Sequence, residues 1–172
     1  MAGEITDPRR AEPGRALSER ETLEGWLEYH RTTLLLKCEG LTDAQRKATP
    51  VPSSALSLHG LVRHMAEVER TWFVRGLLGR TAEPFIWHQP GQRDDELQPL
   101  TSAHWETDLT AWQQACATSR DAAAGLTLDS AASFDGQPLT LRWVLSHMIE
   151  EYARHNGHAD LIRDLADGAV GR

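Results

Sequence analysis

The feature that most constrains the fold is helical periodicity, which recurs in four long segments of the chain. In each segment apolar residues return every three or four positions, the spacing of one face of an α-helix. A glycine that can stop a helix follows each segment: Gly40, Gly79, Gly125 and Gly168. The pattern predicts an all-α chain folded as a four-helix bundle, with helices over about residues 18–39, 57–78, 102–124 and 140–166.

Helix-capping residues stand at the predicted starts. Ser18 is followed three residues later by Glu21, the spacing of a capping box in which serine binds a backbone amide and glutamate reaches back. Ser57 precedes the second segment as an N-cap. The third helix is expected to start near Ser102 and the fourth near Thr140.

The connecting segments differ in composition. Residues 1–17 are polar and contain prolines and arginines, which predicts a flexible N-terminal arm ahead of one domain over residues 18–170. Residues 41–54 include Pro50 and Pro52 and favour an extended connection. Residues 80–100 contain three prolines and predict a long loop between helices 2 and 3, of a length that is often functional in a compact domain.

The charge balance of the 172-residue chain restricts the classes of partner. Lys and Arg number 18 against 25 Asp and Glu, a net charge of -7. Proteins that bind nucleic acid or acidic membranes rely on basic residues, so neither partner is expected. No apolar run is long enough to span a bilayer, and the N-terminus lacks the apolar stretch of a signal peptide. We therefore expect a soluble cytoplasmic protein.

Two polar side chains interrupt the apolar face of the last predicted helix. At about 100° per residue, Glu151 and His155 fall in the same sector as Val144, Met148 and Ile162. Burying a carboxylate and an imidazole without partners is costly. We therefore expect something that compensates both groups.

A divalent metal ion is one such partner. The four-residue spacing of Glu151 and His155 lets both side chains reach one ion from adjacent helical turns. A third ligand is expected from another helix, and His64, near the edge of the apolar face of the second helix, is the candidate. Three protein ligands leave a coordination position open for water or substrate, as in catalytic zinc sites.

Structural roles stay open beside this hypothesis. A single histidine on an apolar face is more often a hydrogen-bonded core residue than a ligand, and Glu151 could pair with His147 or Arg154 in an ion-pair network. His147 and His158 are expected on the flank of the face, at the helix surface or beside the ligands. His64 and Glu67 could form no more than a solvated pair.

Other residues that could carry chemistry have plainer expectations. No glycine-rich nucleotide-binding motif and no nucleophile-elbow motif is present. The two cysteines, Cys38 and Cys116, lie far apart and are expected to be buried, inert thiols. The remaining histidines are expected to be structural or at the surface: His30, His59, His88 and His104. Tryptophans at helical positions are expected in the core or lining a pocket: Trp26, Trp72, Trp105, Trp112 and Trp143.

Two motifs carry a resemblance to a known family. The second predicted helix contains LHGLVRHMAEVERTWF and the fourth contains LRWVLSHMIEEYARHNGHADLIR. Over about residues 18–170, nearly its whole length, the chain resembles the DinB/YfiT-like superfamily. The resemblance implies an up-down-down-up four-helix bundle with a metal site between helices.

Within that superfamily the chain is similar to the metal-binding domain of mycothiol-dependent maleylpyruvate isomerase and related thiol S-transferases. Many members use three histidines; here Glu151 replaces one of them, so the implied ligands are His64, Glu151 and His155, a His-Glu-His set like that of the isomerase domain. Zinc is the expected metal, and nickel, iron or manganese suit a similar donor set. The isomerase has a further C-terminal domain that this chain lacks, so isomerisation itself is not expected.

The resemblance implies a metal-dependent thiol transferase. A low-molecular-weight thiol such as mycothiol would ionise at the metal and attack a small electrophile. The alternative from another class is a non-catalytic metal-binding module that serves in stress response or sensing. The expected partners are therefore small molecules, and a homodimer through exposed helix faces is compatible with the resemblance.

Further residues are assigned to this function by position alone. Arg154 and Arg163 are candidates to hold a carboxylate of the thiol or the substrate, and Arg142 is a weaker candidate. His147 or His158 would orient the metal ligands. The loop over residues 80–100 would wall the pocket for the electrophile.

Overall fold

The structure is a computed structural model that describes residues 7–87, 97 and 100–170. Its elements are α1 (Glu19–Cys38), α2 (Asp43–Lys47), α3 (Leu58–Glu69), the π-helix η1 (Arg70–Leu77), α4 (Trp105–Ala124), β1 (Ala131–Phe134), β2 (Gln137–Thr140) and α5 (Leu141–Asp167). The chain is mostly helical, so the prediction of an all-α protein is confirmed, with one small hairpin added.

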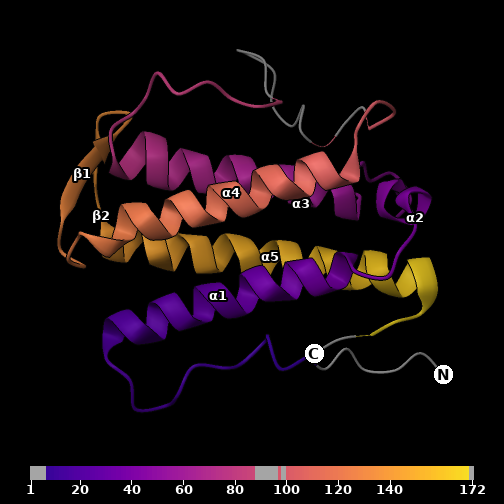
Figure 1. The fold of residues 1–172 in the computed structure, drawn as a ribbon, viewed down its shortest axis with the longest axis horizontal. Helices are drawn as coiled ribbons and strands as arrows, with labels where there is room; N and C mark the ends of the chain where they lie inside the picture. The colour runs from indigo at the N-terminus through magenta and orange to yellow at the C-terminus, as the bar shows by residue number, and fades with distance from the viewer. Residues whose placement is uncertain (1–6, 88–96, 98–99, 171–172) are drawn as a thin grey trace.

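Four long helical stretches lie lengthwise beside one another (Figure 1). Helices α1 and α5 run in one direction, whereas α3 with η1, and α4, run in the other; α2 lies at one end of the molecule and the β-hairpin at the opposite end. Helix α1 packs against α5, α3 packs against α4, and α3 also contacts α5. One apolar core lies between them, with fully buried side chains that include Leu34, Leu61, Met65 and Met148.

Local capping explains most helix starts. The Ser18–Glu21 capping box is present, Ser57 accepts a hydrogen bond from the backbone amide of Gly60, and Thr140 accepts one from that of Trp143. The predicted start of the third helix near Ser102 is wrong: α4 begins at Trp105, after a turn closed by a bond from the Ala103 amide to the Leu100 carbonyl.

Two elements correct the predicted connections. Residues 43–47 form the short helix α2, where an extended connection was expected, because Thr42 and Gln45 make a second capping box. The unpredicted hairpin β1–β2 turns at Asp135 and Gly136, both with positive φ. An Asp-Gly pair is a common two-residue hairpin turn, so this signal was present in the sequence.

Residues 7–17 lie ahead of α1 and contact the helical body. The Arg9 guanidinium donates to the carboxylates of both Asp7 and Glu39, at 2.8–2.9 Å. Pro13 lies against Gly25, where an added Cβ would come within 2.7 Å of the proline Cβ. A side chain larger than that of glycine at position 25 would therefore displace this segment.

A buried polar network crosses the core. The Arg31 guanidinium makes two 2.7 Å hydrogen bonds to the Glu69 carboxylate, both side chains being at most 4% exposed. The Tyr152 hydroxyl donates to Glu69 Oε1 at 2.8 Å and accepts from the Trp112 indole at 2.9 Å. The network joins α1, α3, α4 and α5, so it fixes the register of the helix that carries His64 against the helix that carries Glu151.

Candidate metal centre

The structure brings together the three residues predicted to bind a metal. His64 comes from α3, and Glu151 and His155 come from successive turns of α5. One ligand atom from each residue lies within 4.8 Å of the other two. The ring centroids of His64 and His155 are 4.6 Å apart, and the rings are inclined at 64°. All three residues are partly exposed.

Glu151 turns its two carboxylate oxygens toward different histidines. Oε2 lies 3.4 Å from Nε2 of His155, and Oε1 lies 3.4 Å from Nε2 of His147. The contact with His155 is the main cause of a lowered pKa of Glu151; burial raises that pKa, and the charges of His147, His155 and His64 lower it further. The carboxylate is therefore held in its ionised form, which is the form that binds metal.

The donor set fits a divalent transition metal. Two imidazoles and one carboxylate are ligands that zinc accepts in four-coordinate sites, and three protein ligands leave one position for a further molecule. In the described part of the chain, buried Nδ1 of His155 has no hydrogen-bond partner. An unsatisfied buried imidazole nitrogen is costly, and the ring can flip to offer either nitrogen to an ion.

A second acidic cluster shares one of these residues. His147, Glu150 and Glu151 also bring ligand atoms within 4.8 Å of one another. All three lie on α5, Glu150 is exposed, and its carboxylate is paired with Arg154. The set with His64 spans two helices and is less exposed, so it is the better candidate.

Two tryptophans hold His147 in place. Its ring stacks on Trp143 with centroids 4.8 Å apart and an interplanar angle of 16°, and meets Trp72 edge-on at 4.5 Å. Nε2 of His147 is buried without a hydrogen-bond partner in the described structure, its 3.4 Å contact with Glu151 being long for a hydrogen bond. These contacts hold the His147 ring so that its Nε2 faces the Glu151 oxygen that is turned away from His155.

The other residues assigned by position lie at different distances from the centre. The His158 ring is 5.4 Å from that of His155, and burial lowers the pKa of His158. Arg154 is exposed and paired with Glu150. Arg163 donates to the backbone carbonyls of Lys37 and Glu39 and to Asp167, which ties α5 to the end of α1.

Several expectations for residues outside the centre can be compared with the structure. Arg142 pairs with Glu19 and Asp129 at the start of α5. His30 lies 3.4 Å from the Asn156 amide nitrogen, and His59 is fully buried 2.7 Å from Asp108. His88 and most of the predicted 80–100 loop lie outside the described residues.

The hypothesis that Glu67 forms a solvated pair with His64 is wrong, because Glu67 is buried. Glu67 is 5% exposed and accepts hydrogen bonds from the backbone amides of Ile86 and Trp87. The Arg75 guanidinium lies 3.5 Å from the same carboxylate and donates to the carbonyls of Glu83 and Pro84. Glu67 therefore anchors residues 83–87 to the helical body, a role that depends on loop contacts which no spacing within the helix reveals.

The cysteines are free and buried, as predicted. Burial raises the pKa of the Cys38 thiol to about 12, and burial together with the neighbouring Glu69 carboxylate raises the pKa of Cys116 well above its usual range. Neither thiol is ionised at neutral pH, so neither is a nucleophile of the folded protein.

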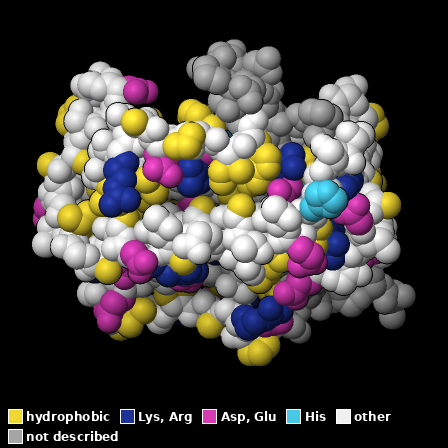
Figure 2. Space-filling model, turned by 45° about the horizontal axis from the view of Figure 1, so that its top comes forward, with side chains coloured by type: hydrophobic (Ala, Val, Ile, Leu, Met, Phe, Trp, Pro, Cys, Tyr) yellow, Lys and Arg dark blue, Asp and Glu magenta, His cyan; other side chains and the backbone are white. Residues whose placement is uncertain are grey.

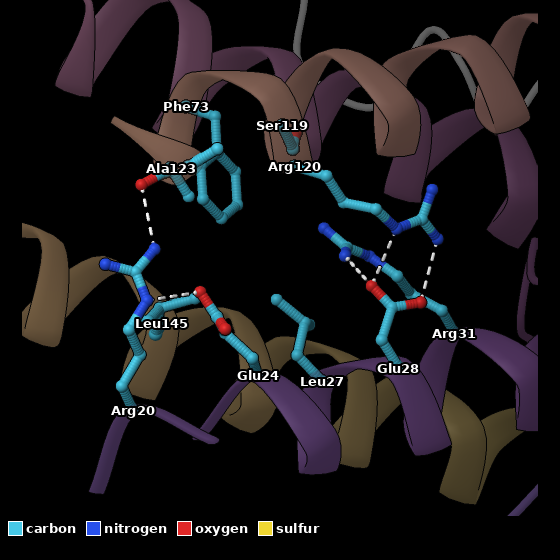
Figure 3. A pocket seen from close by; sticks show the side chains of 11 residues that line it. Arg20, Glu24, Leu27, Glu28, Arg31, Phe73, Ser119, Arg120, Ala123 and Leu145 are labelled. Atoms are coloured by element: carbon cyan, nitrogen blue, oxygen red, sulfur yellow. Dashed lines mark hydrogen bonds and ion pairs between the residues drawn. The ribbon is translucent and has the colours of Figure 1, made fainter. Parts of the chain in front are cut away.

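A separate cavity of about 370 Å³ lies between α1 and α4 (Figure 3). Its floor is apolar, and its charged groups already have partners: Arg31 and Arg120 both bind Glu28, while Arg20 binds Glu24 and two backbone carbonyls. None of the three candidate metal ligands lines this cavity.

The surface charges are mixed. On the face in Figure 2, Lys and Arg side chains lie scattered among Asp and Glu side chains and apolar groups. None of the helices in the described part of the chain is long and apolar enough to cross a membrane.

Comparison with known proteins gives one family. No curated protein matches the chain. Residues 22–168 match the family model described as mycothiol S-transferase, and this match includes most of α1, all of α2 through α5 and all three candidate ligands. A match over that share of the 172 residues shows membership, and the chain belongs to the mycothiol S-transferase family.

Proposed function

We propose that the protein is a metal-dependent thiol S-transferase, with a divalent ion held by His64, Glu151 and His155. The observation that carries the proposal is the convergence of these three ligand atoms to within 4.8 Å. The family supports a thiol substrate, and mycothiol is the proposed one. Zinc suits the donor set best, and nickel, iron and manganese remain to be compared with it by measurement.

The proposed scaffold is a DinB-type, up-down-down-up four-helix bundle. The directions of the helices support it, because α1 and α5 run one way and α3 and α4 run the other (Figure 1). This arrangement places α3 beside α5, the two helices that carry the candidate ligands. A metal ion between them would add a cross-link that stabilises the folded state.

The chemistry requires a thiolate at neutral pH. A bound divalent ion supplies Lewis acidity, which lowers the pKa of a thiol. Glu151 stays ionised as a ligand, and His147 faces its second oxygen and restrains its orientation. The thiol loses its proton to solvent, and its sulfur forms a bond to the electrophilic carbon while the leaving group departs with the electrons of the broken bond.

The attacking sulfur has to come from a second molecule. Both cysteines are buried with raised pKa values, so the chain offers no thiolate of its own. A low-molecular-weight thiol therefore fits the site better than a covalent enzyme intermediate. A cytoplasmic location, where small thiols are kept reduced, is part of the same proposal.

The test is metal content together with thiol consumption. Protein purified without a polyhistidine tag is expected to hold about one equivalent of metal per chain, and to consume mycothiol in the presence of a chloroacetamide electrophile. His155→Ala should lose both properties. His104→Ala removes a histidine outside the triad and is the matched control. Metal binding without thiol consumption would favour a non-catalytic metal-binding module, and absence of metal even after reconstitution would overturn the site.

A further inference from the structure

A second cavity lies at the end of the molecule that carries the hairpin. Its volume is about 320 Å³, and its walls include the rings of Trp72, Trp143 and Phe134 and the side chains of Pro138 and Leu139. Trp72 comes from the π-helix η1, Trp143 from the first turn of α5, and the others from β1 and β2. The cavity is therefore built by three separate parts of the chain.

A series of side-chain contacts along α5 links the Trp143 wall of this cavity to the metal centre. Trp143, His147, Glu151 and His155 follow one another at four-residue intervals along α5, so they form one row on the helix. The ring of Trp143 contacts His147 at 4.8 Å, and His147 lies 3.4 Å from the candidate ligand Glu151. At 1.5 Å per residue, the eight positions from Trp143 to Glu151 correspond to about 12 Å, which one small molecule can span.

The walls of the cavity are preformed. Trp72 lies 5.0 Å from Trp143 and 5.6 Å from Phe134, centroid to centroid, in tilted and edge-on arrangements that stabilise aromatic groups. Leu139 is buried and packs near Gly76 of η1, which holds the hairpin against that helix. Trp72 itself lies in π-helical winding, which occurs mostly as short segments and often at functional sites.

Burial in the core does not explain why a tryptophan occupies position 143. The residue is 46% exposed, although its large aromatic ring contacts Trp72 and His147. The other polar groups that line the cavity are Asp135 and Gln137, and no Lys or Arg among the described residues does so. An anionic group would thus be repelled by Asp135, and a polyol would find few hydrogen-bond partners, whereas a flat uncharged group could stack on the indole rings.

We infer that this cavity is the subsite for a planar, uncharged apolar group carried by the electrophile. The inference rests on the proposed transferase function and adds the substrate class to it. An electrophile whose reactive carbon reaches the thiol at the metal centre would place its aromatic part in the cavity, against the rings of Trp72 and Trp143. The cavity then selects aromatic over small aliphatic electrophiles, while the thiol binds elsewhere.

The experiment compares two electrophiles that share one reactive group. Full-length, metal-loaded protein is assayed for mycothiol conjugation with N-benzylchloroacetamide and with N-methylchloroacetamide. In each case the sulfur displaces chloride, which leaves with the electron pair of the carbon–chlorine bond. The native chain is expected to show a KM about tenfold lower or more for the benzyl compound, the scale of burying one aromatic ring in a partly open site.

Trp143→Ala should abolish that preference by raising the KM of the benzyl compound about tenfold. Trp143→Phe should restore most of it. Phe134→Ala tests the opposite wall without touching His147, and is expected to reduce the preference in the same way. Leu161→Ala removes an exposed apolar side chain on the same helix and is the control expected to change nothing.

The outcomes separate this inference from the proposed function. Metal content is measured for every variant, because loss of metal in Trp143→Ala would lower activity toward both electrophiles alike. Equal KM values for the two compounds in the native protein, or a change confined to the KM of mycothiol, would overturn the subsite. If no electrophile reacts at all, the proposed function fails. The subsite is then tested by binding of the unreactive N-benzylacetamide, which is followed by tryptophan fluorescence. Loss of binding in Trp143→Ala would support the subsite, and unchanged binding would overturn it.

Discussion

The imidazole of His64 on α3 lies 4.6 Å from the imidazole of His155 on α5, centroid to centroid, at an angle of 64°. The two residues are separated by more than half of the chain, so only the packing of α3 against α5 brings them together. Two imidazoles that share a site would repel each other if both were protonated. The ionised Glu151 carboxylate faces His155 with one oxygen and His147 with the other, and its negative charge offsets that cost. A divalent ion would instead bind the imidazoles directly.

The two clusters that share Glu151 can be told apart by neighbouring substitutions. Glu151→Gln keeps the shape of the side chain and removes the charge, and we expect it to weaken metal affinity by at least about a hundredfold, the upper range for loss of a residue next to a ligand. Glu150→Gln, its exposed neighbour, should leave affinity nearly unchanged. Competition with a coloured zinc chelator measures both. A large loss in Glu150→Gln as well would assign the metal to His147, Glu150 and Glu151, because Glu151 belongs to both clusters.

The cysteines should be silent in the folded protein. Because burial raises the pKa of both thiols, we expect no reaction with Ellman's reagent at pH 8 over minutes, and reaction of two thiols per chain after unfolding in guanidinium. Cys38→Ala and Cys116→Ala variants that remain folded should therefore consume mycothiol as fast as the native chain does. A rapidly reacting thiol in the native state would contradict the proposal that the attacking sulfur comes from a second molecule.

The buried ion pair between Arg31 and Glu69 should be costly to break from one side. Arg31→Met leaves the Glu69 carboxylate uncompensated at a site with 0% exposure, and we expect the free energy of unfolding to fall by about 3–5 kcal/mol. The double variant with Glu69→Gln should recover much of this loss, because the uncompensated charge is gone. Urea denaturation of metal-free protein gives both values. A loss below about 1 kcal/mol in the single variant would show that solvent reaches Glu69.

Glu28 should make stability depend on pH. Burial raises its pKa, but the hydrogen bond from Arg120 and the charges of Arg31 and Arg120 outweigh this, so its pKa lies below the ordinary value of 4.5 (Figure 3). Since the folded pKa is the lower one, the stabilisation is fully present above pH 4.5 and is lost as the pH falls through the folded value.

The variant Glu28→Gln measures this contribution. Its free energy of unfolding should lie about 1 kcal/mol below that of the native chain at pH 7, a modest amount because Glu28 is partly solvated. The gap should shrink when both proteins are unfolded in urea below pH 4. A gap that is constant over this range would mean that the charge of Glu28 has no part in it.

Local chemistry made much of the helical layout predictable. Ser18, Ser57 and Thr140 cap α1, α3 and α5 at the predicted places, because a capping bond involves only residues three positions apart. Two further local signals also lie in the sequence, the Thr42–Gln45 capping box and the Asp135–Gly136 turn, although the prolines that follow the box favoured an extended connection. The shift of α4 to Trp105 depends on a turn that carries no side-chain cap.

The sequence by itself determined which residues could share a helix face. Glu151 and His155 have to lie on adjacent turns wherever α5 packs, since the helical repeat sets their spacing. Only the tertiary structure decided that His64 approaches them, that Trp72 and Trp143 enclose His147, and that Glu67 binds the loop backbone. These contacts depend on how separate elements dock, and docking is set by the complementary shapes and buried charges of whole surfaces, which no local pattern along the chain records.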